Sequence, residues 1–180
     1  MPILIFQMKR SKRPRKPRAK MKILGIDPGL QATGYGLIEY ENKKIRLLET
    51  GTIEPKPKDL LQNKLNRIYK ALDTLITQFQ PQVMVLEKLY AHYKHPTTAC
   101  IMGHARGVIC LLCASRNVEL VEHSVKRIRI ALSGNGNSSK EQMRRVESHM
   151  LKLDESKLPL DASDALALAL GYVHIKRLAL

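Results

Sequence analysis

KILGIDPG, from Lys22 to Gly29, is a short apolar run that ends in an acid and then in a Pro-Gly pair. A run of this kind, bounded by a turn signal, predicts a buried β-strand from Lys22 to Asp27. The apolar runs that follow predict two further strands, Gly34 to Glu39 (GYGLIE) and about Ile45 to Ile53. Because the connections between the three strands are short, we expect an antiparallel meander.

After the meander, helical and strand patterns alternate. Asp59 to Phe79 carries apolar residues at helical spacing, and Pro81 ends that helix. Val83 to Leu86 (VMVL) is wholly apolar, which is typical of a strand buried on both faces beside a parallel neighbour. The remaining expected elements are a helix from about Thr97 to Ser115, a strand from Val118 to Glu122, a short helix from about Val125 to Leu132, a loop from Gly134 to Ser139, a helix from Lys140 to Leu151 and a buried helix from about Asp161 to Ile175. The pattern predicts an α/β fold with a mixed five-stranded sheet flanked by helices.

The chain is strongly basic, and its charge is concentrated at the start. Its 180 residues carry a formal net charge of +15, and residues 1–20 hold eight Lys and Arg and no acid. The remaining residues are still basic, with 23 Lys and Arg against 16 acids. This balance indicates a polyanionic partner, above all nucleic acid. A ribosome-bound role or an anionic membrane surface would also explain the charge.

We interpret residues 1–20 as a basic disordered tail or a mis-assigned start, and residues 21–180 as the folded domain. A DNA-gripping arm is the functional alternative for the tail. No apolar run approaches the roughly 18 residues of a membrane span, so no membrane partner is expected. Cys110 and Cys113 lie in the apolar stretch VICLLCA. We expect them to be buried, reduced thiols of a cytoplasmic protein, with a metal or redox site as the alternative.

Four acids stand at the ends of predicted apolar elements. Asp27 and Glu87 end strands, whereas Asp161 and Asp164 open the buried helix on one of its faces. If the two strands are parallel neighbours, their carboxyl ends meet where open α/β sheets place their sites. A cluster of acids repels itself unless it holds cations, and Mg²⁺ prefers carboxylate oxygens. Two such ions can activate a water and stabilise the leaving oxygen in phosphodiester cleavage.

Each acid also has a purely structural interpretation. Asp27 in Asp-Pro-Gly is compatible with turn chemistry alone, and Glu87 with a solvated strand end. Asp161 could cap its helix, with Asp164 as a partner beside the positive end of the helix dipole. These interpretations do not explain why all four acids join apolar elements that are expected to meet.

An ordered set of motifs resembles the RuvC-type Holliday-junction resolvases of bacteria. The resemblance covers nearly all of the chain from Met21 to about His174. Its motifs are GIDPG (Gly25 to Gly29), TGYG (Thr33 to Gly36), LEKLY (Leu86 to Tyr90), GHARGV (Gly103 to Val108) and LPLDASDALALAL (Leu158 to Leu170). The resemblance implies a ribonuclease H-like fold and a structure-selective DNA endonuclease.

The resemblance also assigns a cofactor and partners. The family's metal-binding acids fall on Asp27, Glu87, Asp161 and Asp164, which implies two Mg²⁺ ions per active site, with Mn²⁺ as a possible substitute. The working unit would be a homodimer, which suits a four-way junction of pseudo-twofold symmetry cut by paired symmetric nicks. Family behaviour implies partnership with the branch-migration motor proteins RuvA and RuvB.

Basic and aromatic residues near the acids are candidates for contact with DNA. Lys140 falls where the family has a basic residue near the active site, and Arg129 where relatives often carry Lys. Tyr90 falls where relatives often stack an aromatic side chain on an unpaired base; a half-buried loop position is the alternative. Lys88 and Arg106 are expected to contact phosphates, although a solvated surface would explain them equally well.

Two other functions fit part of the sequence. A ribonuclease H-like nuclease acting on RNA or flaps would keep the fold, and the complete motif set argues against it. A non-catalytic junction-binding module would explain the charge, but all four acids are present. A ribosomal or chromatin-like protein would leave the acids unexplained.

Overall fold

The computed structural model describes residues 20–88, 96–155 and 158–178. Its strands are β1 (Met21–Asp27), β2 (Thr33–Glu41), β3 (Lys44–Ile53), β4 (Val83–Glu87) and β5 (Glu119–His123). Its helices are α1 (Leu61–Phe79), α2 (Pro96–Arg116), α3 (Val125–Ser133), α4 (Lys140–Leu151) and α5 (Leu160–Leu178). All the predicted strands and helices are present, with small differences at their ends.

The strands form one mixed sheet in the order β3-β2-β1-β4-β5. β2 is antiparallel to both of its neighbours, β1 and β3, which confirms the meander. β4 is parallel to both of its neighbours, β1 and β5. The central strand β1 therefore has an antiparallel neighbour on one side and a parallel neighbour on the other. This arrangement confirms the mixed five-stranded sheet predicted from the sequence.

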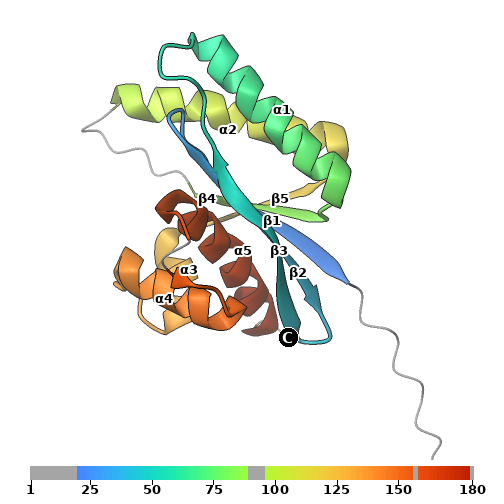
Figure 1. Ribbon diagram of the computed structural model, residues 1–180, viewed down its shortest axis with the longest axis vertical. Coiled ribbons are helices and arrows are strands. Elements are labelled where there is room, and N and C mark those ends of the chain that lie inside the picture. Colours follow the sequence, from blue (N-terminus) through green and yellow to red (C-terminus); the bar gives the residue numbers. More distant parts are fainter. Residues whose placement is uncertain (1–19, 89–95, 156–157, 179–180) are drawn as a thin grey trace, which may run out of the picture.

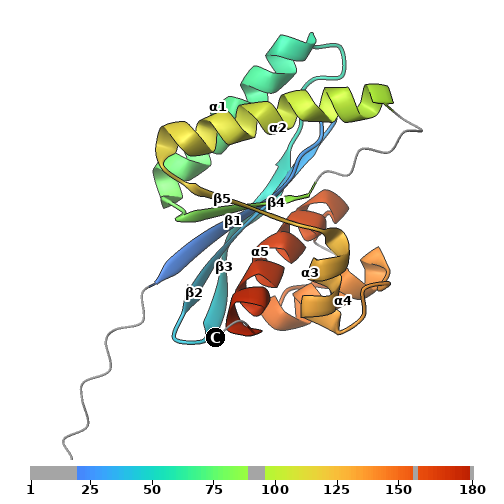
Figure 2. The ribbon, with the colours of Figure 1, turned by 180° about the vertical axis from the view of Figure 1, so that it is seen from behind.

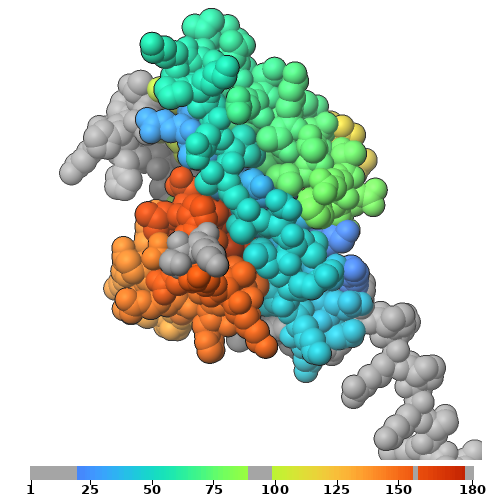
Figure 3. All heavy atoms as spheres, viewed as in Figure 1, coloured from blue at the N-terminus to red at the C-terminus, as the bar shows by residue number. Residues whose placement is uncertain are grey.

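Helices cover both faces of the sheet. α1 and α2 lie on one face, whereas α5 lies on the other with α3 and α4 packed outside it (Figures 1 and 2). Figure 3 shows the same layering as surface, with the teal residues of β3 between green α1 and the orange and red residues of α4 and α5. Both faces of the sheet are therefore covered, as the apolar β4 requires.

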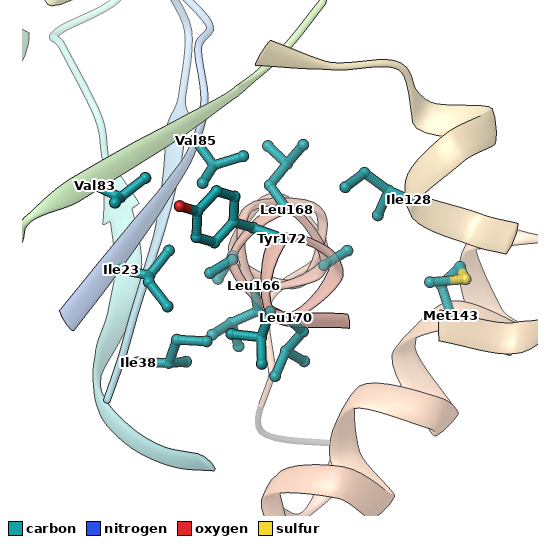
Figure 4. Packing of buried hydrophobic residues seen from close by; sticks show 14 of the residues in the cluster. Ile23, Ile38, Val83, Val85, Ile128, Met143, Leu166, Leu168, Leu170 and Tyr172 are labelled. Carbon is teal, nitrogen blue, oxygen red and sulfur yellow. The ribbon is translucent and has the colours of Figure 1, made fainter. Parts of the chain in front are cut away.

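The alternation of side chains along each strand divides the core in two. Ile23, Ile38 and Val85 point toward α5 and pack with its buried residues, as Figure 4 shows. Their strand neighbours, such as Leu24 and Leu86, point toward α1 and α2 instead. By the same alternation, Asp27 and Glu87 lie on the α5 face of the sheet. Strand register alone thus aims both acids at the first turn of α5.

Two glycines allow α5 to lie directly on the strands. A Cβ atom at Gly25 would lie 2.0 Å from the carbonyl oxygen of Ala165. One at Gly34 would lie 1.9 Å from the carbonyl oxygen of Asp161. Gly34 is also the β2 partner of Asp27 across the ladder. Close backbone contact, which glycine permits, therefore presses the first turn of α5 against the end of β1.

The structure corrects one expectation about α2. Cys113 is buried with Ala105, Ile109 and Leu112, whereas Cys110, one residue after Ile109, lies off this buried stripe and is exposed. The segment Ala99–Arg116 is also long and apolar enough, by length and composition, to cross a membrane, although no single apolar run in it has that length. Only 28% of that segment is buried, so an apolar face of α2 remains uncovered.

Candidate active site

The carboxyl ends of β1 and β4 bring Asp27 and Glu87 side by side. The parallel ladder pairs Ile26 with Leu86, so the two acids are the next residues on each strand. The turn after Asp27 is closed by Thr33, whose hydroxyl donates to the Gly29 carbonyl at 2.7 Å and accepts from the Gly29 N–H at 3.2 Å. Because Thr33 supplies these bonds, turn chemistry alone does not explain why residue 27 is an acid.

The first turn of α5 supplies the other two acids. The helix begins at Leu160, so Asp161 lies inside its first turn and is not the cap. Asp164 is half-buried and faces the strand ends, whereas Asp161 is exposed. The capping interpretation of Asp161 is therefore wrong, and both acids lie on the turn that Gly34 holds against the sheet.

Lys140 reaches this cluster from α4. It is the first residue of the helix, after Ser139, which forms a capping box with Gln142. Its Nζ atom lies 2.5 Å from Oδ2 of Asp164. The bond to Asp164 raises the pKa of Lys140 above its ordinary value, so the side chain stays charged at neutral pH. The cap fixes where α4 begins and therefore where this cation stands.

Three of the four acids, all except the exposed Asp161, line a cavity of about 260 Å³. It is lined by Asp27, Glu87, Val125, Ile128, Arg129, Lys140, Met143, Asp164, Ala167 and Leu168. Within the described ranges, no three His, Cys, Asp or Glu side chains close on a single point as a metal-ligand set. An open cluster is nevertheless compatible with Mg²⁺, which keeps waters and substrate phosphate among its ligands.

The charges in the cavity are unbalanced. Burial, together with the nearby Asp164 and Glu87, raises the pKa of Asp27 to about 7 against the opposing effect of Lys140. Burial and then Asp164 also raise the pKa of Glu87, while Lys140, Arg106 and Arg129 lower it. The two cations of the lining, Lys140 and Arg129, are fewer than its three acids. The donor set therefore fits added divalent cations, because these would favour the ionised carboxylates.

The other predicted site residues lie in different surroundings. Arg129 is half-buried and lines the cavity. Lys88 is exposed just after β4, and its backbone N–H donates to the His123 carbonyl at 2.8 Å. Tyr90 lies outside the described residues. The structure thus brings Arg129 to the acids and leaves Lys88 at their margin.

Arg106 is bound more tightly than the phosphate-contact interpretation suggests. Its side chain is only 11% exposed. Nη1 donates to the backbone carbonyl of Glu87 at 2.6 Å, and Nη2 pairs with Glu122. These bonds tie the end of β4 to α2 and β5. In this state Arg106 fixes the backbone that carries Glu87.

Glu147 of α4 is a buried acid near the site that was not predicted from the sequence. Its side chain is fully buried, and its Oε2 accepts a hydrogen bond of 2.6 Å from the Ser163 hydroxyl. Its position four residues after the buried Met143 places an acid on the core face of α4. This spacing from Met143 is the sequence signal that could have identified Glu147 as buried.

Comparison with known proteins gives consistent matches. A family model described as crossover junction endodeoxyribonuclease RuvC matches residues 23–172. A protein of that name from Rhodopirellula baltica is 38% identical over 155 residues, 86% of this chain and 87% of the relative. One from Thermotoga petrophila is 40% identical over 150 residues, 83% of this chain and 90% of the relative. Among solved structures, T. thermophilus RuvC in complex with Holliday junction substrate aligns with a TM-score of 0.82 at 25% identity, covering 88% of this chain and 96% of that chain.

Proposed function

Since the chain belongs to the RuvC family of crossover junction endodeoxyribonucleases and is a Holliday junction resolving endonuclease, we propose that its clustered acids are the metal site. Asp27, Glu87, Asp161 and Asp164 would hold two Mg²⁺ ions, with Mn²⁺ able to replace them. The observation that carries the proposal is the convergence of Asp27, Glu87 and Asp164 on one cavity with raised pKa values at both strand-end acids.

The chemistry that such ions supply is activation of a water and stabilisation of the leaving oxygen during hydrolysis of a phosphodiester bond. The chain's own groups hold the carboxylates in place and supply positive charge. The backbone of Asp27 is paired with Gly34 of β2, and that of Glu87 with His123 of β5. Because the backbone is fixed in this way, the two carboxylates need little reorganisation. Lys140, held by Asp164, places a fixed positive charge at the cavity, where it would stabilise charge that develops on the phosphate.

Contacts with the junction would come from the basic rim of the cavity. Arg129 and Lys140 both line it, which supports the proposal that they would meet the phosphate to be cleaved. Lys88 extends this rim beyond β4, and Tyr90 would engage an opened base near the crossover. Such phosphate contacts make affinity depend steeply on salt. Arg106 would contribute through Glu87 more than through DNA.

The uncovered face of α2 supports a homodimer. Ile101 is 40% exposed and Leu111 is 67% exposed. A Cβ atom added at Gly107 would meet nothing within 4 Å in the described structure. An apolar helix face with small residues suits close packing against a second copy, and two copies would place two sites on the two like strands of a junction.

The dimer has a direct test. Leu111→Glu should give a monomer by analytical ultracentrifugation at concentrations where the unaltered protein is a dimer. Ile130→Glu is a matched control, because Ile130 is 50% exposed on α3, on the other side of the sheet. If Leu111→Glu is still a dimer, α2 does not form the dimer interface.

Membership in the family also supports the finer partner and location proposals. A nuclease that acts on junction DNA would meet RuvA and RuvB, the motor that moves the junction, in the bacterial cytoplasm. Copurification of this chain with RuvA and RuvB on junction DNA, compared with the chain on linear DNA, tests that partnership.

The metal-site proposal is tested with a labelled four-way junction that has a movable core. Cleavage is measured with Mg²⁺ and with EDTA, for the unaltered protein and for Asp27→Asn, with linear duplex as the substrate control. Paired nicks only on the junction, only with Mg²⁺ and not with Asp27→Asn would support the proposal. Tight binding without cleavage under any condition would favour a non-catalytic junction-binding module.

A further inference from the structure

Glu147 is an acid in a place that disfavours acids. Its side chain lies in the α4–α5 interface with none of its surface exposed. Within the described structure, its only hydrogen bond comes from Ser163, and Oε1 has no partner. Burial raises its pKa to about 8, against the opposing effect of the Ser163 bond. An apolar side chain of similar size would fill this position at lower cost.

The partner of Glu147 is part of the metal-binding turn. Ser163 lies between Asp161 and Asp164, is almost fully buried, and donates its backbone N–H to the Pro159 carbonyl at 2.9 Å. Its side chain therefore joins the first turn of α5 directly to α4. A shift of α4 relative to Ser163 would be transmitted to both acids.

α4 contacts the same turn at a second point. Lys140, two helical turns before Glu147, reaches Asp164 through its ammonium group. Apolar packing of Met143 holds α4 on the core, and two polar contacts along one face add constraints on both its register and its angle. The Glu147–Ser163 bond is the buried member of this pair, while the Lys140 side chain is 56% exposed. The buried bond is less open to competition from water.

We infer that Glu147 is a positioning residue, which through Ser163 locks α4 against the first turn of α5 and so aims Lys140 and Asp164 into the cavity. The inference rests on the proposed metal site. Glu147 itself is not among the residues that line the cavity. Its loss should therefore slow the chemical step and leave junction affinity intact.

The test compares substitutions that separate stability from position. Glu147→Leu fills the space without the hydrogen bond, Ser163→Ala removes the donor, and Glu147→Gln keeps both the shape and an acceptor. Glu141→Gln on the exposed face of α4 is the matched control. Each protein is assayed in single turnover with saturating protein and Mg²⁺, beside junction binding in EDTA and unfolding by urea.

We expect Glu147→Leu and Ser163→Ala each to cut about tenfold to a hundredfold more slowly, since errors near 1 Å in a site have effects of that size. The double variant should be no slower than either alone, because both remove one bond. Glu147→Gln should recover to within about threefold of the unaltered rate. Junction affinity and resistance to urea should not fall in Glu147→Leu.

A second readout does not depend on cleavage. In metal-free protein, amide hydrogen exchange in the first turn of α5 should be faster in Glu147→Leu than in the unaltered chain or Glu141→Gln. Wild-type cleavage and wild-type exchange in Glu147→Leu would overturn the inference. If the unaltered protein does not cut with Mg²⁺, the proposed function fails, while the exchange measurement still decides whether Glu147 fixes the turn.

Discussion

Replacing Gly34 by alanine should greatly slow junction cleavage by a chain that still folds. The added Cβ would lie 1.9 Å from the carbonyl oxygen of Asp161, whereas ordinary contacts begin at 3.4 Å. The obstructing atom belongs to the helix backbone and cannot rotate away. The first turn of α5 must therefore retreat by about 1.5 Å, taking Asp161 and Asp164 with it.

The size of the effect follows from this displacement. A misplacement of about 1 Å in a catalytic arrangement reduces rates by roughly a hundredfold, so we expect a loss of that order in Gly34→Ala. Overpacking of this kind also destabilises proteins by about 1–3 kcal/mol. The chain should remain folded, because most of α5 still packs on the sheet beyond its first turn.

The assay is single-turnover cleavage with protein in excess over junction, so that binding does not limit the rate, together with urea unfolding. Gly51→Ala is the control, because its Cβ would first meet the movable side chain of Tyr35, at 2.9 Å. Its rate should stay within about threefold of the unaltered protein. A folded Gly34→Ala protein that cuts at the unaltered rate would refute the claim that contact between β2 and α5 sets the position of the acids.

Three further predictions concern protonation, packing and the tail. In EDTA, stability to urea should fall as pH rises from about 4 toward 8. The reason is that the pKa values of Asp27 and Glu147 are raised in the folded state, to about 7 and about 8, so the unfolded chain releases its protons first. Asp27→Asn should flatten that slope, and an unchanged slope would contradict the assignment. Tyr172→Phe should leave stability to urea unchanged or raise it by about 1 kcal/mol, because the buried hydroxyl has no hydrogen-bond partner in the described structure (Figure 4). A loss of stability above about 1 kcal/mol would show that the hydroxyl does form a hydrogen bond in the folded protein. Deleting residues 1–19 should leave the melting temperature and the cleavage rate of the remaining chain unchanged, because the described core is formed by residues from β1 onward; a large loss of either would make the tail part of the domain.

The sequence was informative where one physical rule governs a segment. The short apolar run before Asp27 and the all-apolar VMVL before Glu87 left few alternatives to buried strands, and strands of that kind place their ends together. The periodicity of α5 likewise predicted a helix buried on nearly all sides. These three elements were enough to predict a cluster of acids. Asp27, Glu87 and Asp164 line one cavity, whereas Asp161 is exposed and is not among the lining residues.

Features that depend on contacts between distant segments could not be predicted in the same way. Nothing local to Arg106 indicates that its guanidinium reaches the Glu87 carbonyl, since the two groups come from different elements. Cys110 was expected to be buried because its neighbours are apolar, but the uncovered face of α2 is apolar too. Glu147 carried a signal in its spacing from Met143, which had no meaning until Ser163 was known to face it.

The most direct test of the metal site is anomalous diffraction from a crystal of this chain soaked in Mn²⁺. Anomalous peaks should lie between Asp27 and Glu87 and beside Asp164, and they should be lost from Asp27→Asn crystals grown and soaked in the same way. Two peaks at these carboxylates would support the proposed pair of ions. A fully soaked crystal with no peak near Asp27 and Glu87, or with its peaks elsewhere on the chain, would contradict the account.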